Sequence, residues 1–431
     1  MRKIATFAII LIFFILLFSI IRASIFGEVE QEKHIYFEIV LLLLLAILAE
    51  VAVLYLKQQS IMILMILGIL ISPSFMDVAT GFINSLNLPF GIIAKAPEII
   101  KDQDIIQIFA QLGAIILLFK VGLHSRIDRI FSKENLLVAV AGVILPFIAG
   151  YLYASLNGGN FAYSMFLGAA LTATSVGVTA ALLKEMKVLG ERFSEIIIGA
   201  AVIDDVLSLL VLSVVINMGS AQADAMIPVI YTLISAIIFI AGAIISGKYF
   251  VEYFDRNELS DKRFLLALSF MLFFSYVAEV IKLSAIVGAF LAGIILNRSR
   301  HYRGIEEKSY GLELLFMPIF FISLGMLVDV KALFLFGVPI IAITAIAAIT
   351  KIAGCGGAAL IAKLNMKEAM AVGAGMMPRG EVALIIASIG LSKAVLSQQE
   401  YSIISAMALL TAFITPPLLM HIIKSIKEKK K

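Results

Sequence analysis

The sequence predicts an all-α polytopic membrane protein with about fourteen transmembrane helices. Three observations predict this fold class. Of the 431 residues 61% are hydrophobic, only 15% are charged, and the mean hydropathy is +1.06. Soluble proteins keep about a quarter of their residues charged, so most of this chain is suited to lipid. Apolar segments recur from end to end without a polar domain between them.

The predicted spans are the segments apolar enough to cross a hydrocarbon core, which takes about 20 residues. The third and the tenth are short and rich in glycine. Residues 75–103, which contain Pro89 and Pro97, are expected to form a loop with some interfacial helix. In chain order, the predicted spans are 4–21, 35–56, 60–73, 104–122, 136–154, 161–184, 193–217, 226–247, 263–281, 283–296, 310–328, 335–361, 368–391 and 398–423.

The distribution of Lys and Arg predicts the orientation. An even number of spans puts both termini on one side. Placing both in the cytoplasm leaves most of the 34 Lys and Arg residues in inner loops. The chain is therefore expected to be a multi-pass protein of the cell (plasma) membrane. We interpret 4–21 as a retained helix. A signal peptide is the alternative, because Met1–Lys3 precede an apolar run, but no small-x-small cleavage site follows Ile21.

Two similar segments indicate an inverted repeat. LLFKVGLHSRI (117–127) closes the fourth span and FFISLGMLVDV (320–330) closes the eleventh, so that Gly122 aligns with Gly325. The same offset carries Thr174 of the sixth span onto Met377 of the thirteenth. Seven helices separate the copies, and an odd separation turns one copy upside down. Inverted repeats with paired interrupted helices are typical of secondary transporters.

Five ionisable residues lie in the middle of predicted spans: Asp204, Asp205, Lys351, Arg379 and Glu381. Each costs about 2.5–3.5 kcal/mol to insert, so each must face protein or a water-filled cavity. Adjacent helical residues point about 100° apart. One aspartate can therefore pair with Lys351 while the other faces a cavity. The alternative is that both aspartates only form salt bridges, with Arg379 as the second cation.

The sixth and thirteenth spans carry signals for helix breaks. Thr172, Thr174, Ser175 and Thr179 surround Gly177 in one, and Pro378 and Gly380 interrupt the other. Non-helical backbone at this depth is tolerated only where it is buried or lines a cavity. Hydroxyls, freed carbonyls and a carboxylate suit a small hard cation. The alternative for the Thr/Ser cluster is ordinary helix packing through small residues.

Several function classes are disfavoured. The single Cys355 excludes an internal disulfide framework, and no phosphate-binding glycine motif is present. A channel would need a selectivity filter such as TVGYG, which the sequence lacks. An intramembrane aspartyl protease would carry its two aspartates on separate helices so that they share a proton. Here they are neighbours.

Seven segments occur in the order found in the cation:proton antiporter-2 family, over about residues 35–424. They are LLFKVGL, TATSVGVTAALL, AVIDDVLSLLVL, AIVGAFLAGIIL, PIFFISLGM, the Lys351 helix and PRGEVALIIA. The chain resembles the double-aspartate sodium/proton exchangers of this family. The resemblance implies a thirteen-helix exchanger domain at 35–424 with two crossing unwound helices. Residues 1–34 would add a helix and an external linker, and 425–431 would form a basic cytoplasmic tail.

The resemblance also implies roles for residues. Asp205 would be the ion-binding, metal-coordinating carboxylate, and Asp204 would pair with Lys351. Thr174 and Ser175 would line the ion site. The remaining residues would support the unwound helices: Gly177, Pro378, Arg379, Gly380 and Glu381.

The implied activity is electrogenic exchange of sodium (or lithium) for protons by elevator-like access. The resemblance also implies that the protein is a homodimer and is not an enzyme. It implies no cofactor and no nucleic-acid partner. A potassium/proton antiporter of the same family is the alternative. Two residues depart from the family pattern. Lys120 is interpreted as a structural, snorkelling residue, and His124 as a loop residue with a possible part in pH response.

Overall fold

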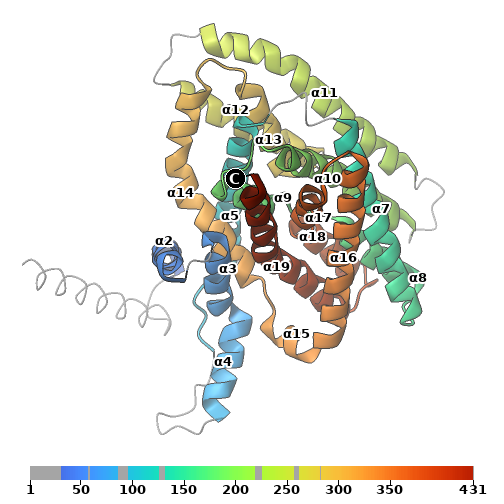
Figure 1. Ribbon diagram of the computed structural model, residues 1–431. Helices are drawn as coiled ribbons and strands as arrows, with labels where there is room; N and C mark the ends of the chain where they lie inside the picture. The colour runs from blue at the N-terminus through green and yellow to red at the C-terminus, as the bar shows by residue number, and fades with distance from the viewer. Residues whose placement is uncertain are drawn as a thin grey trace, which may run out of the picture. The chain divides into compact units, whose positions relative to one another are not determined.

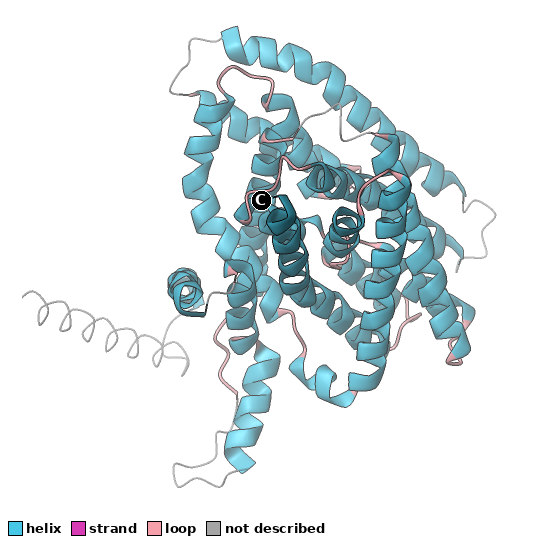
Figure 2. Ribbon diagram, in the orientation of Figure 1, coloured by secondary structure: helices cyan, strands magenta, loops and turns pink. Residues whose placement is uncertain are grey.

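A computed structural model describes residues 31–56, 59–85, 96–125, 132–218, 226–256, 262–281 and 283–430. These residues form helices and loops and contain no strand, which confirms the predicted all-α class (Figure 2). Nine helices of the described ranges are long and apolar enough to cross a membrane, or ten if one bent pair counts as a span. The count of about fourteen stays a prediction, and the predicted span 4–21 lies outside the described residues.

The chain divides into two compact units. The first holds residues 1–111 and 318–331, with helices α2 (Gln31–Leu56), α3 (Ser60–Leu70) and α4 (Pro73–Ser85) and the end of α14 (Tyr302–Met326). The predicted third span is shorter than expected. It ends at Leu70, and a 56° bend separates it from α4. Pro73 occupies the first position of α4, where its missing N–H costs nothing.

The second unit holds residues 112–317 and 332–431. Its helices, labelled in Figure 1, include the main parts of α5 and α14. In chain order they are α5 (Gln103–Leu123), α7 (Lys133–Leu156), α8 (Phe161–Thr172), α9 (Val176–Glu185), α10 (Arg192–Met218), α11 (Met226–Arg256), α12 (Arg263–Val280), α13 (Ala285–Leu296), α14, α16 (Gly337–Ile361), α17 (Met366–Gly375), α18 (Glu381–Ser392) and α19 (Gln398–Lys430). The short α15 (Val330–Leu335) lies where the two units meet in sequence.

Three helix boundaries differ from the predicted spans. Helix α11 continues to Arg256, and α14 begins at Tyr302, so both extend beyond their apolar cores. Helix α19 runs to Lys430, which makes residues 425–430 part of the last helix. Hydropathy marks the part of a helix that lies in lipid, whereas a helix can continue into water. The helical ends therefore could not be placed from apolar content alone.

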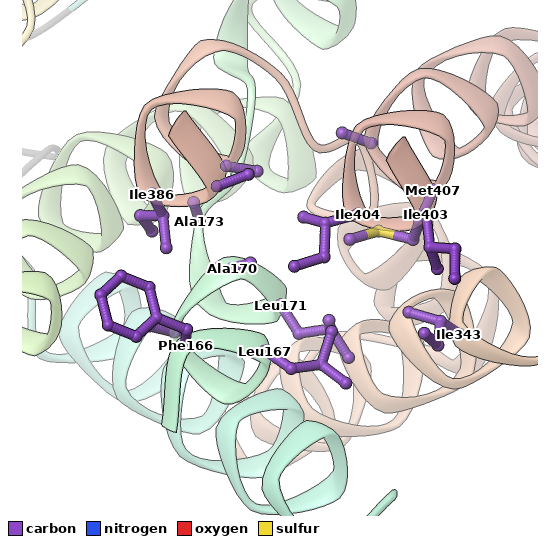
Figure 3. Close-up of a cluster of buried hydrophobic side chains, with 14 of the residues drawn as sticks. Phe166, Leu167, Ala170, Leu171, Ala173, Ile343, Ile386, Ile403, Ile404 and Met407 are labelled. Atoms are coloured by element: carbon purple, nitrogen blue, oxygen red, sulfur yellow. The ribbon is translucent and has the colours of Figure 1, made fainter. Parts of the chain in front are cut away.

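The core of the second unit is a cluster of buried apolar side chains (Figure 3). Phe166, Leu167 and Leu171 of α8 meet Ile386 of α18 and Ile404 of α19 in this cluster. Helix α7 packs against both α8 and α16 (Figure 1). In a bilayer such contacts are held by close packing, because lipid is as apolar as the side chains. The cluster holds α8 and α18, each of which is one half of a broken span.

Glycines mark the closest helix crossings in both units. A Cβ built on Gly293 of α13 would lie 3.0 Å from Cα of Gly122 on α5. A Cβ built on Gly325 of α14 would likewise lie 3.0 Å from Cα of Gly68 on α3. Gly122 and Gly325 are the two positions that the predicted repeat aligns, and each meets a glycine on a neighbouring helix. These matching contacts are consistent with the repeat.

Candidate cation site

Two spans of the second unit are broken in the middle. Residues 173–175 separate α8 from α9, and residues 376–380 separate α17 from α18. The two breaks contact each other. Ser175 N donates to Pro378 O at 2.8 Å, Thr179 Oγ1 donates to Gly375 O at 2.6 Å, and Thr174 Oγ1 lies 3.4 Å from Met376 O. The backbone groups freed at one break are therefore satisfied by the other.

The sequence explains where the second break falls. Pro378 has no N–H to continue α17. Gly380 lies so close to the other break that a Cβ at this position would be 2.6 Å from Cβ of Ser175. Any larger residue would push the two broken spans apart. Gly177, the second residue of α9, is also buried. The structure thus places Ser175, Pro378 and Gly380 at one crossing.

Arg379 does not reach the aspartates by a hydrogen bond. Its guanidinium donates to Met377 O at 2.8 Å, to Ala347 O at 3.2 Å and to Met376 O at 3.4 Å. The side chain is fully buried, and the backbone N–H of Arg379 donates to Thr411 Oγ1 at 2.9 Å. A cation beside the last carbonyls of α17 also offsets the negative end of that helix. Glu381 is the first residue of α18, and its side chain lies outside the described part of the structure.

Asp204 and Lys351 form an ion pair between α10 and α16. Lys351 Nζ lies 2.8 Å from Asp204 Oδ1, and both side chains are fully buried. The other oxygen of Asp204, Oδ2, has no hydrogen-bond partner among the described residues. The pair packs against Gly142 of α7, where a Cβ would come within 3.2 Å of Lys351 Nζ and 2.5 Å of Cys355 Sγ. Gly142 and Cys355 therefore shape this site, although the sequence did not single them out for it.

Asp205 lines a different space from its neighbour. A cavity of about 30 Å³ is bordered by Asp205, Thr174, Ser175 and Ser284, together with apolar residues such as Phe290. One water molecule needs roughly 10–15 Å³ by the same measure, so the cavity has room for a small ion with a water. A carboxylate and several hydroxyls form a set of hard oxygen ligands. The structure thus brings three of the predicted ion-site residues to one cavity and adds Ser284, which the sequence analysis missed.

A second group of charges was also missed. Glu313 of α14 is buried and accepts from Lys120 of α5 through Oε2 and from Lys184 of α9 through Oε1. Lys120 is 4% exposed, so the snorkelling interpretation was wrong: its ammonium points to a buried carboxylate and not to water. A signal was available, because Glu313 was the one acidic residue inside the predicted span 310–328. His124 Nε2 lies 3.2 Å from Glu306 Oε1 at the end of α5.

A bundle of apolar helices, with two broken spans that cross beside buried charges, is the architecture of a secondary transporter. Residues 39–423 match the family described as sodium/hydrogen exchanger, transmembrane. The chain belongs to this family.

Relatives and solved structures agree with this family. The chain is 33% identical to the High-affinity Na(+)/H(+) antiporter NhaS3 of Synechocystis over 76% of this chain and 74% of that protein. It is 30% identical to the Na(+)/H(+)-K(+) antiporter GerN of Bacillus cereus, over 91% of this chain and 97% of that one. The sodium proton antiporter MjNhaP1 of Methanocaldococcus jannaschii has the same fold, with a TM-score of 0.67, 17% identity and coverage of 91% and 95%.

Proposed function

We propose that the chain exchanges sodium, or lithium, for protons across a membrane, with Asp205 as the carboxylate that holds either ion. One observation carries this proposal: Asp205, Thr174 and Ser175 line one small cavity at the crossing of two broken helices. The family match and the relatives named as Na(+)/H(+) antiporters support it.

Competition for one site is enough to produce exchange. A buried carboxylate that binds sodium must first lose its proton, and a proton that returns displaces the sodium. If the site changes sides only when occupied, each turn carries one kind of ion in each direction. The chain needs no enzymatic step and no resident cofactor for this cycle. The ion gradients supply the free energy.

Asp204 and Lys351 support a finer proposal about charge. When Asp204 releases Lys351, it becomes a second carboxylate that can take up a proton. Two protons would then exchange for one sodium ion, and the cycle would move net charge. Oδ2 of Asp204, which has no hydrogen-bond partner in the described part of the chain, is compatible with such a change of partner.

The broader arrangement remains part of the proposal. We infer elevator-like movement of the site-bearing helices, a homodimer, and a location in the cell membrane with both termini in the cytoplasm. The orientation is supported by the Lys and Arg distribution. The movement is supported by the interrupted helices, since broken spans in paired repeats accompany alternating access.

Potassium/proton exchange is the second candidate. A relative that covers nearly the whole chain is named as a Na(+)/H(+)-K(+) antiporter. Hard oxygen ligands accept both alkali cations, so the ligand types do not separate them. A comparison of sodium, lithium and potassium in one assay separates the two candidates.

The decisive experiment uses purified protein in proteoliposomes with a pH-sensitive dye. Asp205→Asn keeps the size of the side chain but removes its charge. We expect cation-dependent proton flux to fall to the level of empty liposomes while the melting temperature is retained. Asp77→Asn, at an exposed aspartate of α4, is the matched control and should exchange normally. Sodium-dependent proton flux in a folded Asp205→Asn protein would refute the assignment.

A further inference from the structure

A second pocket lies where α12 and α14 begin. It has a volume of about 230 Å³, and Arg263, Arg300, His301 and Lys308 line it together with Gly304 and apolar side chains. None of its described lining residues is acidic. Three of these side chains, Arg263, Arg300 and Lys308, are positively charged at neutral pH, so the pocket suits a negatively charged group. In the sequence analysis, the Lys and Arg residues of this region served only to predict the orientation of the chain in the membrane.

The pocket is built by a fixed turn. Asp255 at the end of α11 accepts from Ser299 Oγ at 2.6 Å and from Arg300 N at 3.3 Å. Ser299 Oγ in turn accepts from His301 N at 3.1 Å. These bonds fix the backbone of two lining residues, Arg300 and His301. The half-buried carboxylate of Asp255 is thus engaged with the turn and is not among the lining residues.

Arg263 and His301 contact each other across the pocket. Arg263 Nη1 lies 3.2 Å from His301 Nδ1, so the guanidinium donates and the imidazole nitrogen accepts. In that tautomer Nε2 of His301 carries a hydrogen and is a donor. Guanidinium and ammonium groups suit an anion with several oxygens, and arginine suits phosphate in particular. The first turns of α12 and α14 add N–H groups and the positive ends of two helices.

We propose that this pocket binds a phosphate group. The phosphate can belong to the headgroup of an anionic lipid or to a soluble phosphate compound. Its place is compatible with a lipid, because Arg263 is the first residue of an 18-residue span and therefore lies at the headgroup level of a bilayer. The site is separate from the cation site and does not depend on the proposed exchange.

Two variants and one control test the pocket. Arg300→Gln with Lys308→Gln removes two positive charges from the lining. Gly304→Leu keeps every charge and fills the pocket, since a Cβ on Gly304 meets no atom within 4 Å. Arg303→Gln removes a charge next to the pocket but outside its lining, where Arg303 Nε contacts the Tyr302 hydroxyl at 3.3 Å. Melting temperatures establish that each variant is folded.

The affinity of purified protein is measured for short-chain phosphatidylglycerol, for phosphatidylcholine of the same chain length and for inorganic phosphate. We expect binding to weaken about tenfold or more in both pocket variants, because charged hydrogen bonds are lost or blocked. Arg303→Gln should bind as the wild type does. Preference for phosphatidylglycerol identifies a lipid headgroup, and binding of inorganic phosphate with the same variant pattern identifies a soluble source.

Three results would overturn the proposal. The first is that neither phosphatidylglycerol nor inorganic phosphate binds. The second is that both pocket variants bind with wild-type affinity. The third is that Arg303→Gln loses as much affinity as the pocket variants, which would indicate diffuse charge attraction. Asp205→Asn should bind phosphate normally, so this test and the exchange assay fail independently.

Discussion

The second unit contains two groups of ion pairs, each built on a buried carboxylate, that differ in how many of the carboxylate oxygens accept from a lysine. Between α10 and α16, Lys351 takes one oxygen of Asp204, and the other oxygen has no hydrogen-bond partner among the described residues. Among α5, α9 and α14, Glu313 gives one oxygen to Lys120 and the other to Lys184. Asp204 of the first pair is the sequence neighbour of Asp205, which borders the cation cavity.

Under the proposed function, this difference predicts which of the two carboxylates can exchange its partner. A carboxylate that already accepts from two lysines has little capacity for another cation, so the Glu313 group fastens three helices together. A carboxylate with one oxygen in use can trade its lysine for a proton at lower cost. Burial alone does not separate these roles, because both groups are buried. The two carboxylates differ instead in the number of lysines that each one accepts from.

Glu313→Gln is expected to have the largest effect, and it tests whether the Glu313 group has a structural role. It leaves the buried Lys120 and the partly buried Lys184 without their carboxylate. The loss of one partner of a buried pair costs about 3–5 kcal/mol. We expect a large fall in melting temperature, measured in detergent, with sodium-dependent proton flux retained well below that temperature. Lys184→Gln is the control, since it leaves Glu313 paired with Lys120 and should cost less. Loss of flux without loss of stability would contradict the structural role.

The next variant, Lys351→Gln, tests the other group. Without its lysine, buried Asp204 is expected to keep a proton throughout the cycle, so that only Asp205 exchanges ions. Sodium/proton exchange should continue but become electroneutral. Under the proposed two-proton cycle, the wild type moves one net charge, which against 100 mV is worth about 2.3 kcal/mol, or roughly fifty-fold in the sodium gradient. The variant should show no such shift in proteoliposomes with an imposed potassium-diffusion potential.

Thr350→Val is the matched control for that measurement. Thr350 neighbours Lys351 on α16, and its hydroxyl donates to Ile346 O of the same helix at 2.6 Å. Its loss should leave the response to membrane potential intact. A Lys351→Gln protein that still responds to the potential would show that the second proton is not carried through this pair.

Much of the fold could be predicted from the sequence because a membrane restricts the choices. Lipid offers no hydrogen bonds, so long apolar segments must be helices. The same reasoning located the breaks, since Pro378 and Gly380 cannot continue a helix at their depth without support. The crossing of these breaks followed from the family resemblance, and the structure describes it through the bond between Ser175 and Pro378.

The candidate site was predictable where charge itself was the signal. Asp204, Asp205 and Lys351 stand out in apolar segments, and simple pairing of charges places Lys351 with one aspartate. Glu313 gave the same kind of signal, but Lys120 and Lys184 lie near the ends of their predicted spans, where a charge can also reach water, so charge alone did not indicate that they share a buried carboxylate. Gly142 and Ser284 were missed for a related reason. Small residues in apolar helices are common, and only the packed structure shows which of them face a charged pair or a cavity.

A smaller effect is expected from Gly142→Ala, which sharpens the comparison at the Asp204–Lys351 pair. The added methyl would lie 2.5 Å from Cys355 Sγ and 3.2 Å from Lys351 Nζ, so the pair must shift. Overpacking of this kind costs about 1–3 kcal/mol, and we expect slower exchange as well. The control is Gly357→Ala on α16, where a Cβ meets nothing within 4 Å. Equal behaviour of the two variants would mean that Gly142 does not shape the pair.

The smallest effect belongs to an exposed pair in the first unit. Lys331 Nζ lies 2.7 Å from Asp77 Oδ2, almost the same distance as in the Lys351–Asp204 pair, but its partners are 52% and 47% exposed. Water and salt screen such charges, so Lys331→Gln should change the free energy of unfolding by no more than about 1 kcal/mol. The change should shrink further in high salt. Because distance is matched, a loss as large as that of Glu313→Gln would mean that burial and partner number do not set the strength of these pairs.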